Sequence, residues 1–460
     1  MISEKQKIRH LYLRLGLGFT PDEDQLLSQK KLSQHIEELF SNSEKIEYLD
    51  YLPYPLDEGK EATNTKVLLL ILKSLEQTQD LSMAWMFRMA TTKAAMREKM
   101  ATFWHNHFAT AVPFAYLMQV QNNTIRKYAL GSFRDLTQAI AKDPAMINYL
   151  NNQQNHKDNP NENFARELME LFTLGVGHYT EKDIKESARA FTGWSIDKKG
   201  EYIFKPNDHD DGVKEFRGKT GNFNGDEIIN LILSDKQCAI YITRKIYAEV
   251  VNEFVDEEKV LSLAESFFAS DYDIKKLLRT IAESEWFYDE KNIGSKIMSP
   301  VELMIRSKKL IALQPKENSI QIKLQRVLGQ LLMFPPSVAG WKGGRNWIDG
   351  ASLFLRLNIP LAARGKFKIN AAAKPEFEES GETKPVQELF FSGDFNPLLK
   401  YISGKTDEEL IDSSCALLLQ KPLGENEKQK FVALLKLNSP EEKKIEALTL
   451  IMCSPDFQLI

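Results

Sequence analysis

The chain has 460 residues, which is enough for about three domains of average size or for one large body with additions. Hydrophobic residues make up 43% of the chain and charged residues 27%, ordinary values for a water-soluble globular protein. The 60 lysines and arginines against 64 aspartates and glutamates leave a net charge of -4, which excludes a broadly basic nucleic-acid-binding protein, so we expect no nucleic-acid partner. The three cysteines lie far apart, which excludes a zinc finger and a disulfide scaffold.

The start of the chain has no signal-peptide pattern. Residues 1–10 carry charges and no apolar stretch. The longest notable apolar run, residues 67–72, is far shorter than the roughly 20 residues that a membrane-spanning helix needs. From this sequence alone we expect a soluble, cytoplasmic protein with no membrane span.

Helical spacing dominates the chain. Apolar residues recur three and four positions apart, for example at Tyr247, Val250 and Val251. Strand-like alternation is confined to residues 201–206, which could form a hairpin with the segment before them. The sequence therefore predicts a mainly α fold, a large multi-helix body with at most a small β-hairpin at residues 194–204 and long ordered loops.

Three polar segments predict the long loops. Residues 151–161 are rich in Asn, Gln and Asp, and residues 205–224 are rich in Gly, Asp and Lys. Residues 334–350 contain two prolines and four glycines. Long loops inside a compact chain are uncommon and often functional, so we expect function to involve these segments.

One further segment, residues 371–385, has the composition of a linker, with an alanine run, prolines and several glutamates. We expect it to separate a main helical body, residues 1–370, from a C-terminal helical segment, residues 386–460. Because the apolar residues 417–419 and Phe457 need burial, this second segment is expected to pack against the body.

The segment FWHNHF, residues 103–108, combines aromatic residues with two histidines. On a helix, Met100, Trp104 and His107 share one apolar stripe, and His105 lies at its edge. Two histidines two positions apart diverge by about 200° on a helix, so they bind one metal ion only if the helix ends there or another ligand comes from elsewhere. The alternative is that each histidine is buried and hydrogen-bonded to a backbone group or a carboxylate.

Residues 161–172 place two carboxylates on one flank of an expected helix. Glu167 borders the apolar stripe, Glu170 lies one step further round, and Arg166 is four positions from both Glu162 and Glu170. We take Glu167 and Glu170 as candidate catalytic residues, which could bind a cation or move protons, and Arg166 as a candidate ligand-binding residue. The alternative is a set of acids that suit the helix dipole and form surface ion pairs.

Two more histidines lie in connections between expected helices. Gly175 is a typical helix end and Thr180 with Asp183 is a capping-box pattern, so His178 lies between two helices. His209 stands among three acidic residues in a glycine-containing loop, a composition that suits a divalent cation. Both are candidate metal ligands; the alternatives are an exposed histidine and a solvated polar loop.

A loop of prolines, glycines and tryptophans spans residues 335–347. Flat rings bury a large area at little entropic cost, so Trp341 and Trp347 are candidate ligand-binding residues that wall a pocket. The alternative is that both tryptophans fasten the loop to the helical body.

Seven motifs, spread over nearly the whole chain, resemble those of a known protein family. In order they are HLYLRLGLGFTP, FWHNHFAT, DPAMINYL, NENFARELMELFTLGVGHYTEKD, ARAFTGW, SPVELM and GQLLMFPPSVAGWKGGRNWID. This set resembles the large bacterial family catalogued as domain of unknown function 1800, for which no reaction is known. Many members carry export signals and lie beside a gene for a sulfatase-like family of exported proteins. The resemblance therefore implies a periplasmic or exported location in many relatives and an exported sulfatase-like protein as a candidate partner.

Two functions follow from these residues. The first is a metal-assisted hydrolase, in which one or two of the candidate ligands His105, His107, His178 and His209 hold a divalent cation together with carboxylates, and a glutamate activates water. The second is a non-catalytic binding or assembly protein that receives a partner protein or a glycan at the tryptophan loop. Convergence of imidazoles and carboxylates within about 5 Å around one cavity favours the enzyme, and separate hydrogen bonds favour binding.

The geometry that we expect is specific. The helix with His105 and His107 should pack beside the helix with Glu167 and Glu170, and one of these carboxylates should hydrogen-bond His107. The loop with the two tryptophans should close one side of the resulting pocket.

Overall fold

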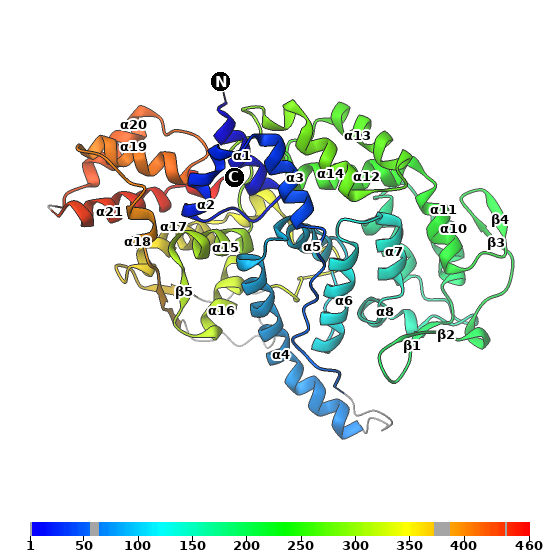
Figure 1. Cartoon of the computed structure of the whole chain (residues 1–460). Coiled ribbons are helices and arrows are strands. Elements are labelled where there is room, and N and C mark those ends of the chain that lie inside the picture. Colours follow the sequence, from blue (N-terminus) through cyan, green and yellow to red (C-terminus); the bar gives the residue numbers. More distant parts are fainter. Residues whose placement is uncertain (1, 56–63, 372–386, 438) are drawn as a thin grey trace.

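Helices dominate the protein, and short strands connect some of them (Figure 1). The computed structural model describes residues 2–55, 64–371, 387–437 and 439–460. The α-helices of the first half are α1 (Glu4–Arg14), α2 (Pro21–Leu26), α3 (Leu32–Asn42), α4 (Asn64–Thr91), α5 (Ala95–His107), α6 (Ala115–Tyr128), α7 (Phe133–Ala141), α8 (Pro144–Tyr149), α9 (Asn163–Glu167), α10 (Glu181–Ala190) and α11 (Gly225–Leu233). Those of the second half are α12 (Lys236–Val250), α13 (Glu257–Ala269), α14 (Ile274–Glu283), α15 (Pro300–Ile311), α16 (Asn318–Leu328), α17 (Gly350–Ala363), α18 (Asn396–Leu399), α19 (Asp407–Leu418), α20 (Glu425–Leu434) and α21 (Pro440–Met452). The predicted mainly α fold is confirmed.

Short antiparallel pairs account for the strands in the described parts of the chain. They are β1 (Trp194–Ile196) with β2 (Tyr202–Phe204), β3 (Lys214–Phe216) with β4 (Lys219–Gly221), β5 (Gln314–Pro315) with β8 (Phe391–Ser392), and β6 (Ile369–Ala371) with β7 (Gln387–Leu389). The first pair is the hairpin predicted at residues 194–204. The sequence does not predict the other pairs, because strands of two or three residues are too short to show an alternating pattern.

The three predicted loops are ordered and contain short helical turns. These turns are η2 (Asn152–Gln154), η4 (Pro206–Asp208) and η6 (Gly344–Trp347), and further turns are η1 (Leu27–Gln29), η5 (Glu285–Tyr288) and η8 (Asp456–Gln458). The loop at residues 205–224 also holds the β3–β4 pair.

Helix ends follow the local chemistry of the sequence. The Thr180 hydroxyl accepts a hydrogen bond from the Asp183 backbone, and the Asp183 carboxylate accepts one from the Thr180 backbone, so the capping box at the start of α10 is confirmed. Gly175 ends the preceding helix with a φ of 86°, in the left-handed region that favours glycine. These two ends place His178 in an exposed connection.

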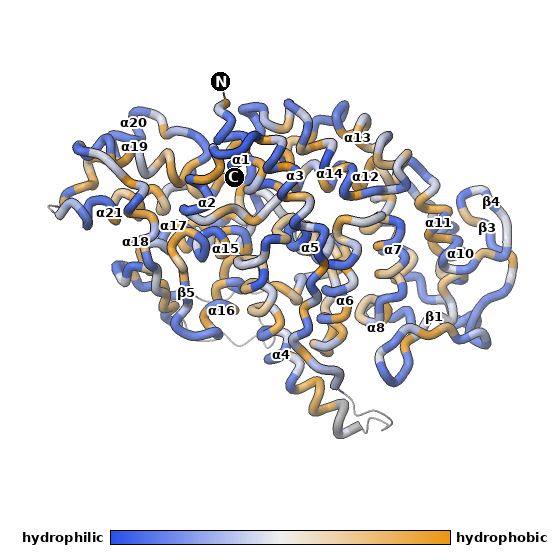
Figure 2. Tube along the Cα trace, viewed as in Figure 1, coloured by the Kyte–Doolittle hydropathy of each residue, from blue (hydrophilic) through white to orange (hydrophobic). Residues whose placement is uncertain are grey.

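Helices α5 and α6 lie in the middle of the molecule (Figure 1), and apolar residues gather along the inner faces of the surrounding helices (Figure 2). Trp104 of α5 is fully buried, with its ring centroid 5.4 Å from that of Phe133 in α7. His107 is also buried, as the apolar stripe of α5 predicts.

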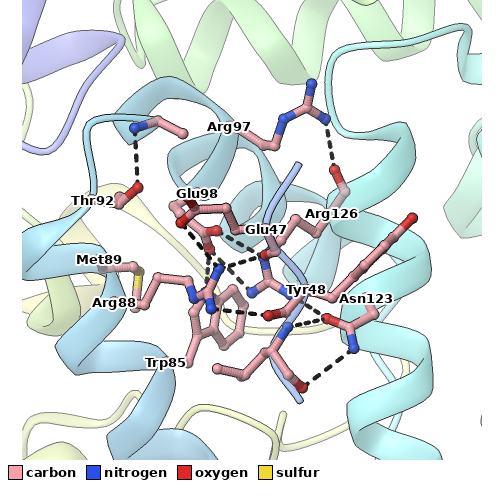
Figure 3. A network of polar contacts seen from close by, with 12 residues as sticks. Glu47, Tyr48, Trp85, Arg88, Met89, Thr92, Arg97, Glu98, Asn123 and Arg126 are labelled. Atoms are coloured by element: carbon pink, nitrogen blue, oxygen red, sulfur yellow. Dashed lines mark hydrogen bonds and ion pairs between the residues drawn. The ribbon is translucent and has the colours of Figure 1, made fainter. Parts of the chain in front are cut away.

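A buried ion pair fastens α4 to α5 and α6 (Figure 3). The Glu98 carboxylate accepts hydrogen bonds from Trp85 Nε1 at 2.7 Å and from Arg126 Nε at 2.7 Å. Arg97, on the same helix as Glu98, donates to the Ser43 carbonyl at 2.8 Å and holds the segment after α3 in place. Because buried charges are tolerated when they are paired and hydrogen-bonded, this network is a structural joint.

Helix α4 has 28 residues, and its first turns project from the body (Figure 1). Leu68, Leu69 and Leu72 of these turns are exposed. Among the described helices, α4 included, none is both long and apolar enough to cross a membrane.

The C-terminal segment makes many contacts with the rest of the chain. Ile460 and Lys296 exchange two backbone hydrogen bonds, and Arg306 donates to the carbonyls of Leu418 and Phe457. Its first strands, β7 and β8, pair with β6 and β5. The predicted linker at residues 371–385 falls, apart from Ala371, outside the described residues, so the division at this segment stays a prediction.

Candidate functional site

The two histidines of α5 each have a backbone partner. His105 Nε2 accepts a hydrogen bond from the Met333 backbone N–H at 3.2 Å. His107 Nε2 donates to the Phe172 carbonyl at 3.0 Å. The prediction that Glu167 or Glu170 is the partner of His107 is wrong. The helix that carries these carboxylates does contact His107, but it presents a backbone carbonyl.

That carbonyl is available because the helix changes its winding. After α9 the chain continues as a π-helix, η3 (Leu168–Thr173), in which Leu174 donates to the Met169 carbonyl five positions back. The carbonyls at its end accept from side chains of other helices: Phe172 from His107, and Leu171 from Tyr241 at 3.0 Å.

Both histidines of α5 are neutral near pH 7. Burial lowers the pKa of His105 to about 4. Burial, together with the positive charge of Lys245, lowers the pKa of His107 well below its usual range. The backbone partners therefore hold uncharged rings.

The two predicted carboxylates are close in the chain, Glu167 at the end of α9 and Glu170 in the π-helix, but each has different neighbours. Burial, and next the charge of Glu170, raises the pKa of Glu167. Glu170 accepts a hydrogen bond from the Tyr179 hydroxyl. Arg166 pairs with Glu162, one of the two acids at four-residue spacing, at 3.0 Å, and with Glu181 in the first turn of α10 at 2.9 Å.

The other two predicted metal ligands lie elsewhere. His178 is exposed, and its carbonyl accepts from Arg217. His209 is buried, and its Nδ1 donates to the Thr192 carbonyl at 2.9 Å.

The loop around His209 surrounds the ammonium group of a lysine side chain, Lys214. Lys214 Nζ donates to the Asp210 carbonyl at 2.5 Å, the Gly212 carbonyl at 3.0 Å and Asn222 Oδ1 at 3.3 Å. The predicted divalent-cation loop is thus an oxygen cage around a buried ammonium group, because the lysine that follows the acidic residues turns back into it. In the described parts of the chain, no group of three or more His, Cys, Asp and Glu residues could hold a metal ion.

A cavity of about 360 Å³ lies beneath the aromatic loop. Trp341 and Trp347 line it, as predicted, together with Phe103 and His107 of α5. The predicted convergence of the tryptophan loop with α5 is therefore present. Glu167, Glu170 and Arg166 are not among the residues that line this cavity.

Asn106 and two glycines allow the aromatic loop to pack closely against the helical body. Asn106 Oδ1 accepts from the Trp341 backbone N–H at 2.6 Å, and its Nδ2 donates to the Trp341 carbonyl at 3.2 Å. Gly340 has a φ of 73°, and a Cβ there would lie 2.3 Å from Asn106 Oδ1. A Cβ on Gly344 would lie 2.5 Å from a carboxylate oxygen of Glu253. The loop can reach the cavity rim because these positions have no side chain.

Four charged side chains form a closed cluster at the cavity wall, which we call the charge cluster: Lys99, Glu249, Lys296 and Glu302. Lys99 Nζ contacts Glu302 and lies 3.0 Å from Glu249 Oε1. Lys296 Nζ lies 2.5 Å from Glu249 Oε1 and 3.1 Å from Glu302 Oε1. Each lysine therefore touches both carboxylates, and the cluster is electrically balanced.

The pKa values of Glu249 and Glu302 indicate that the lysines of the charge cluster stabilise their ionised forms. Burial alone would raise the pKa of Glu302, but Lys296 and Lys99 lower it well below its usual range. Burial would likewise raise the pKa of Glu249, and the same two lysines lower it. Both carboxylates are therefore ionised and paired near pH 7, which makes them poor proton donors.

Sequence reasoning missed this cluster, and one signal could have located part of it. Glu302 lies in the motif SPVELM, where it also completes the capping box of α15 by accepting from the Ser299 backbone at 2.7 Å. Lys99, Glu249 and Lys296 stand in no polar motif. In the sequence, Lys99 and Glu249 resemble ordinary charged positions on helices, and Lys296 lies in the non-helical segment before α15.

Comparisons with known proteins identify one family. No curated protein and no solved structure matches the chain. One family does match, over residues 10–459, and it is described as protein of unknown function DUF1800. Since this match covers nearly the whole chain, including the cavity and the loop above it, the protein belongs to the DUF1800 family.

Proposed function

We propose that this protein is a non-catalytic binding protein that holds a sugar ring of a glycan in the cavity beneath the aromatic loop. The observation that carries the proposal is the composition of the cavity wall. Trp341, Trp347 and Phe103 supply flat apolar surface, and Gln330 adds a polar side chain beside them. Sugars combine apolar C–H faces with polar hydroxyl edges, which suits a wall of this kind.

The partners of the candidate residues support binding over metal-assisted hydrolysis. His105, His107 and His209 are each engaged by a backbone group in a different place. Of the carboxylates that line the cavity, Glu249 and Glu302 are each paired with two lysines, and Glu253 is paired with Arg345. Catalytic roles for Glu167 and Glu170 and the exported sulfatase-like partner remain predictions of the sequence alone.

The test uses an array of neutral and acidic oligosaccharides with the full chain and with Trp347→Ala. We expect the intact protein to bind at least one oligosaccharide, and Trp347→Ala to bind it at least about tenfold more weakly, because a tenfold loss corresponds to about 1.4 kcal/mol of stacking and burial. Phe87→Ala, which removes an exposed ring of α4, is the control and should bind normally.

Unfolding temperatures of both variants show whether they are folded. The proposal fails if no oligosaccharide binds the intact protein, or if a folded Trp347→Ala variant binds as well as the intact chain.

A further inference from the structure

Lys245 lies on α12 and lines the same cavity as the charge cluster. It stands one helical turn before Glu249, a member of that cluster. Its side chain is largely withdrawn from solvent, and this burial lowers the pKa of the Lys245 ammonium group to about 8. The cavity thus contains a third lysine besides Lys99 and Lys296.

This third lysine has no partner of opposite charge among the described residues. Its Nζ lies over the ring of Tyr241, 5.2 Å from the ring centroid. By contrast, Lys99 and Lys296 each contact two carboxylates. Lys245 is therefore a cation in the cavity without an ion pair.

The neighbouring groups do not supply the missing negative charge. Glu249 is bound by both lysines of the charge cluster, and Glu253 at the rim is bound by Arg345 at 3.2 Å. His107, which faces Lys245 from α5, is neutral, and its pKa is lowered in part by Lys245 itself. Among the described residues, the carboxylates of the wall are thus paired with other cations, and none of them is an ion-pair partner of Lys245.

Such an arrangement is energetically costly. A poorly hydrated ammonium group without a partner is unfavourable, and an anion placed against it would relieve that cost. Proteins retain costly groups of this kind at binding sites, where stability is given up for function. A purely structural lysine would be expected to have a carboxylate or carbonyl partner, as Lys214 has.

We propose that Lys245 binds a negatively charged group, a carboxylate or a phosphate, on the ligand of the cavity. The ligand is then an organic anion. The assignment of a sugar ring depends on the function proposed above, whereas the assignment of an anionic group depends on Lys245. The aromatic wall would hold the ring, and Lys245 would fix its orientation from the α12 side.

The experiment labels the full chain with pyridoxal 5′-phosphate, which carries an aldehyde and a phosphate. The neutral amine adds to the aldehyde carbon, water leaves, and borohydride reduces the imine to a stable secondary amine. Peptide mass spectrometry then compares Lys245 with Lys236, an exposed lysine at the start of the same helix. An amine of pKa about 8 has more than about a hundred times the neutral fraction of an ordinary lysine near pH 7, so Lys245 should label at least about tenfold faster.

Competitors identify the charged group. Glucuronate, glucose 6-phosphate, acetate and inorganic phosphate are compared with glucose, which has no charge. We expect at least one anion to protect Lys245 from labelling and glucose to protect it less. A carboxylate that protects alone indicates a carboxylate ligand, and a phosphate that protects alone indicates a phosphate ligand. Labelling no faster than at Lys236, or no protection by anions beyond that by glucose, would overturn the proposal.

Two variants separate charge from packing. The protecting anion should raise the unfolding temperature of the intact protein and of Lys245→Arg, but not of Lys245→Met. Lys245→Met should itself fold well, because it removes an unpaired charge from a poorly hydrated place. An anion that stabilises Lys245→Met as strongly as the intact chain binds elsewhere, and the inference is then wrong.

The outcomes also separate this inference from the proposed function. Protection by inorganic phosphate, with no oligosaccharide bound on the array, would support the anion site and reject the glycan. Neutral oligosaccharide binding that depends on Trp347, with no anion protecting Lys245, would support the glycan and reject the anion site.

Discussion

His105 shows how a single residue can look like a metal ligand and serve the fold instead. Its ring accepts a hydrogen bond from Met333, which has a φ of 68°, an uncommon value for a residue other than glycine. Met333 stands at the base of the segment that leads to Trp341. The buried ring therefore helps to hold the backbone bend from which the aromatic loop starts.

The low pKa of His105 predicts a specific pH dependence. The unfolded ring has a pKa of about 6.5 and the folded ring about 4, so between these values the unfolded state binds a proton that the folded state does not. The contribution of His105 to stability is complete above pH 6.5 and is lost as the pH falls towards 4. The difference in unfolding free energy between the intact protein and His105→Gln should therefore fall by about 2 kcal/mol from pH 7 to pH 5.

Urea unfolding at a series of pH values measures this difference. His178→Gln, at an exposed position, is the matched control for the loss of one imidazole. A His105→Gln difference that stays constant or grows on acidification would show that the ring is protonated in the folded protein.

At the scale of helices, the charge cluster connects elements that are distant in the chain. Lys99 lies on α5, Glu249 on α12 and Glu302 on α15, and Lys296 lies just before α15. Removing charged groups from water costs free energy, so each buried charge of the cluster depends on its partners of opposite sign. The same groups form part of the cavity wall, which ties the shape of the cavity to the packing of three helices.

Removing one charge of the cluster should destabilise the protein strongly. Glu302→Gln keeps the size of the side chain but leaves Lys99 and Lys296 with one carboxylate between them. We expect a loss of about 3–5 kcal/mol in the free energy of unfolding, the range found when one partner of a buried ion pair is removed.

Glu285→Gln is the control, because Glu285 pairs with Lys7 at 2.9 Å on the surface. It should leave the free energy of unfolding nearly unchanged. If chemical denaturation gave similar small losses for both variants, the charge cluster would be well hydrated and would not join the helices.

For the whole molecule, the contacts of the C-terminal segment decide how the chain behaves when it is cut. Besides the Ile460 and Arg306 contacts, Arg9 of α1 donates to the Ala416 carbonyl at 2.5 Å, and the two termini lie near each other (Figure 1). Phe457 and residues 417–419 are buried, as their apolar character predicts. The segment therefore shares the core of the body.

Cleavage within residues 372–386 should leave the two pieces together. We expect the nicked protein to elute as one particle in gel filtration and to unfold in a single thermal transition, because the buried contacts on both sides remain. Elution of residues 386–460 as a separate soluble piece, with the remainder keeping the unfolding temperature of the uncut chain, would contradict this packing.

Much of the architecture could be predicted from local patterns. The helical spacing, the hairpin at residues 194–204, the capping box at Thr180 and the burial of Trp104 and His107 depend on residues a few positions apart. That the tryptophan loop forms a pocket wall could also be predicted, since its composition alone suits an ordered aromatic surface.

The candidate site was predicted in part. The sequence predicts that the aromatic loop closes a pocket beside the FWHNH helix, and Trp341, Trp347 and Phe103 do line one cavity. The charges of its wall depend on how the helices pack: they are Glu249 and Glu302 with two lysines, in place of Glu167 and Glu170. The reason is separation along the chain, since Lys99 and Glu302 are 203 positions apart. A pairing over that distance has no periodicity to reveal it, and it is decided when helices pack and buried charges must find a partner.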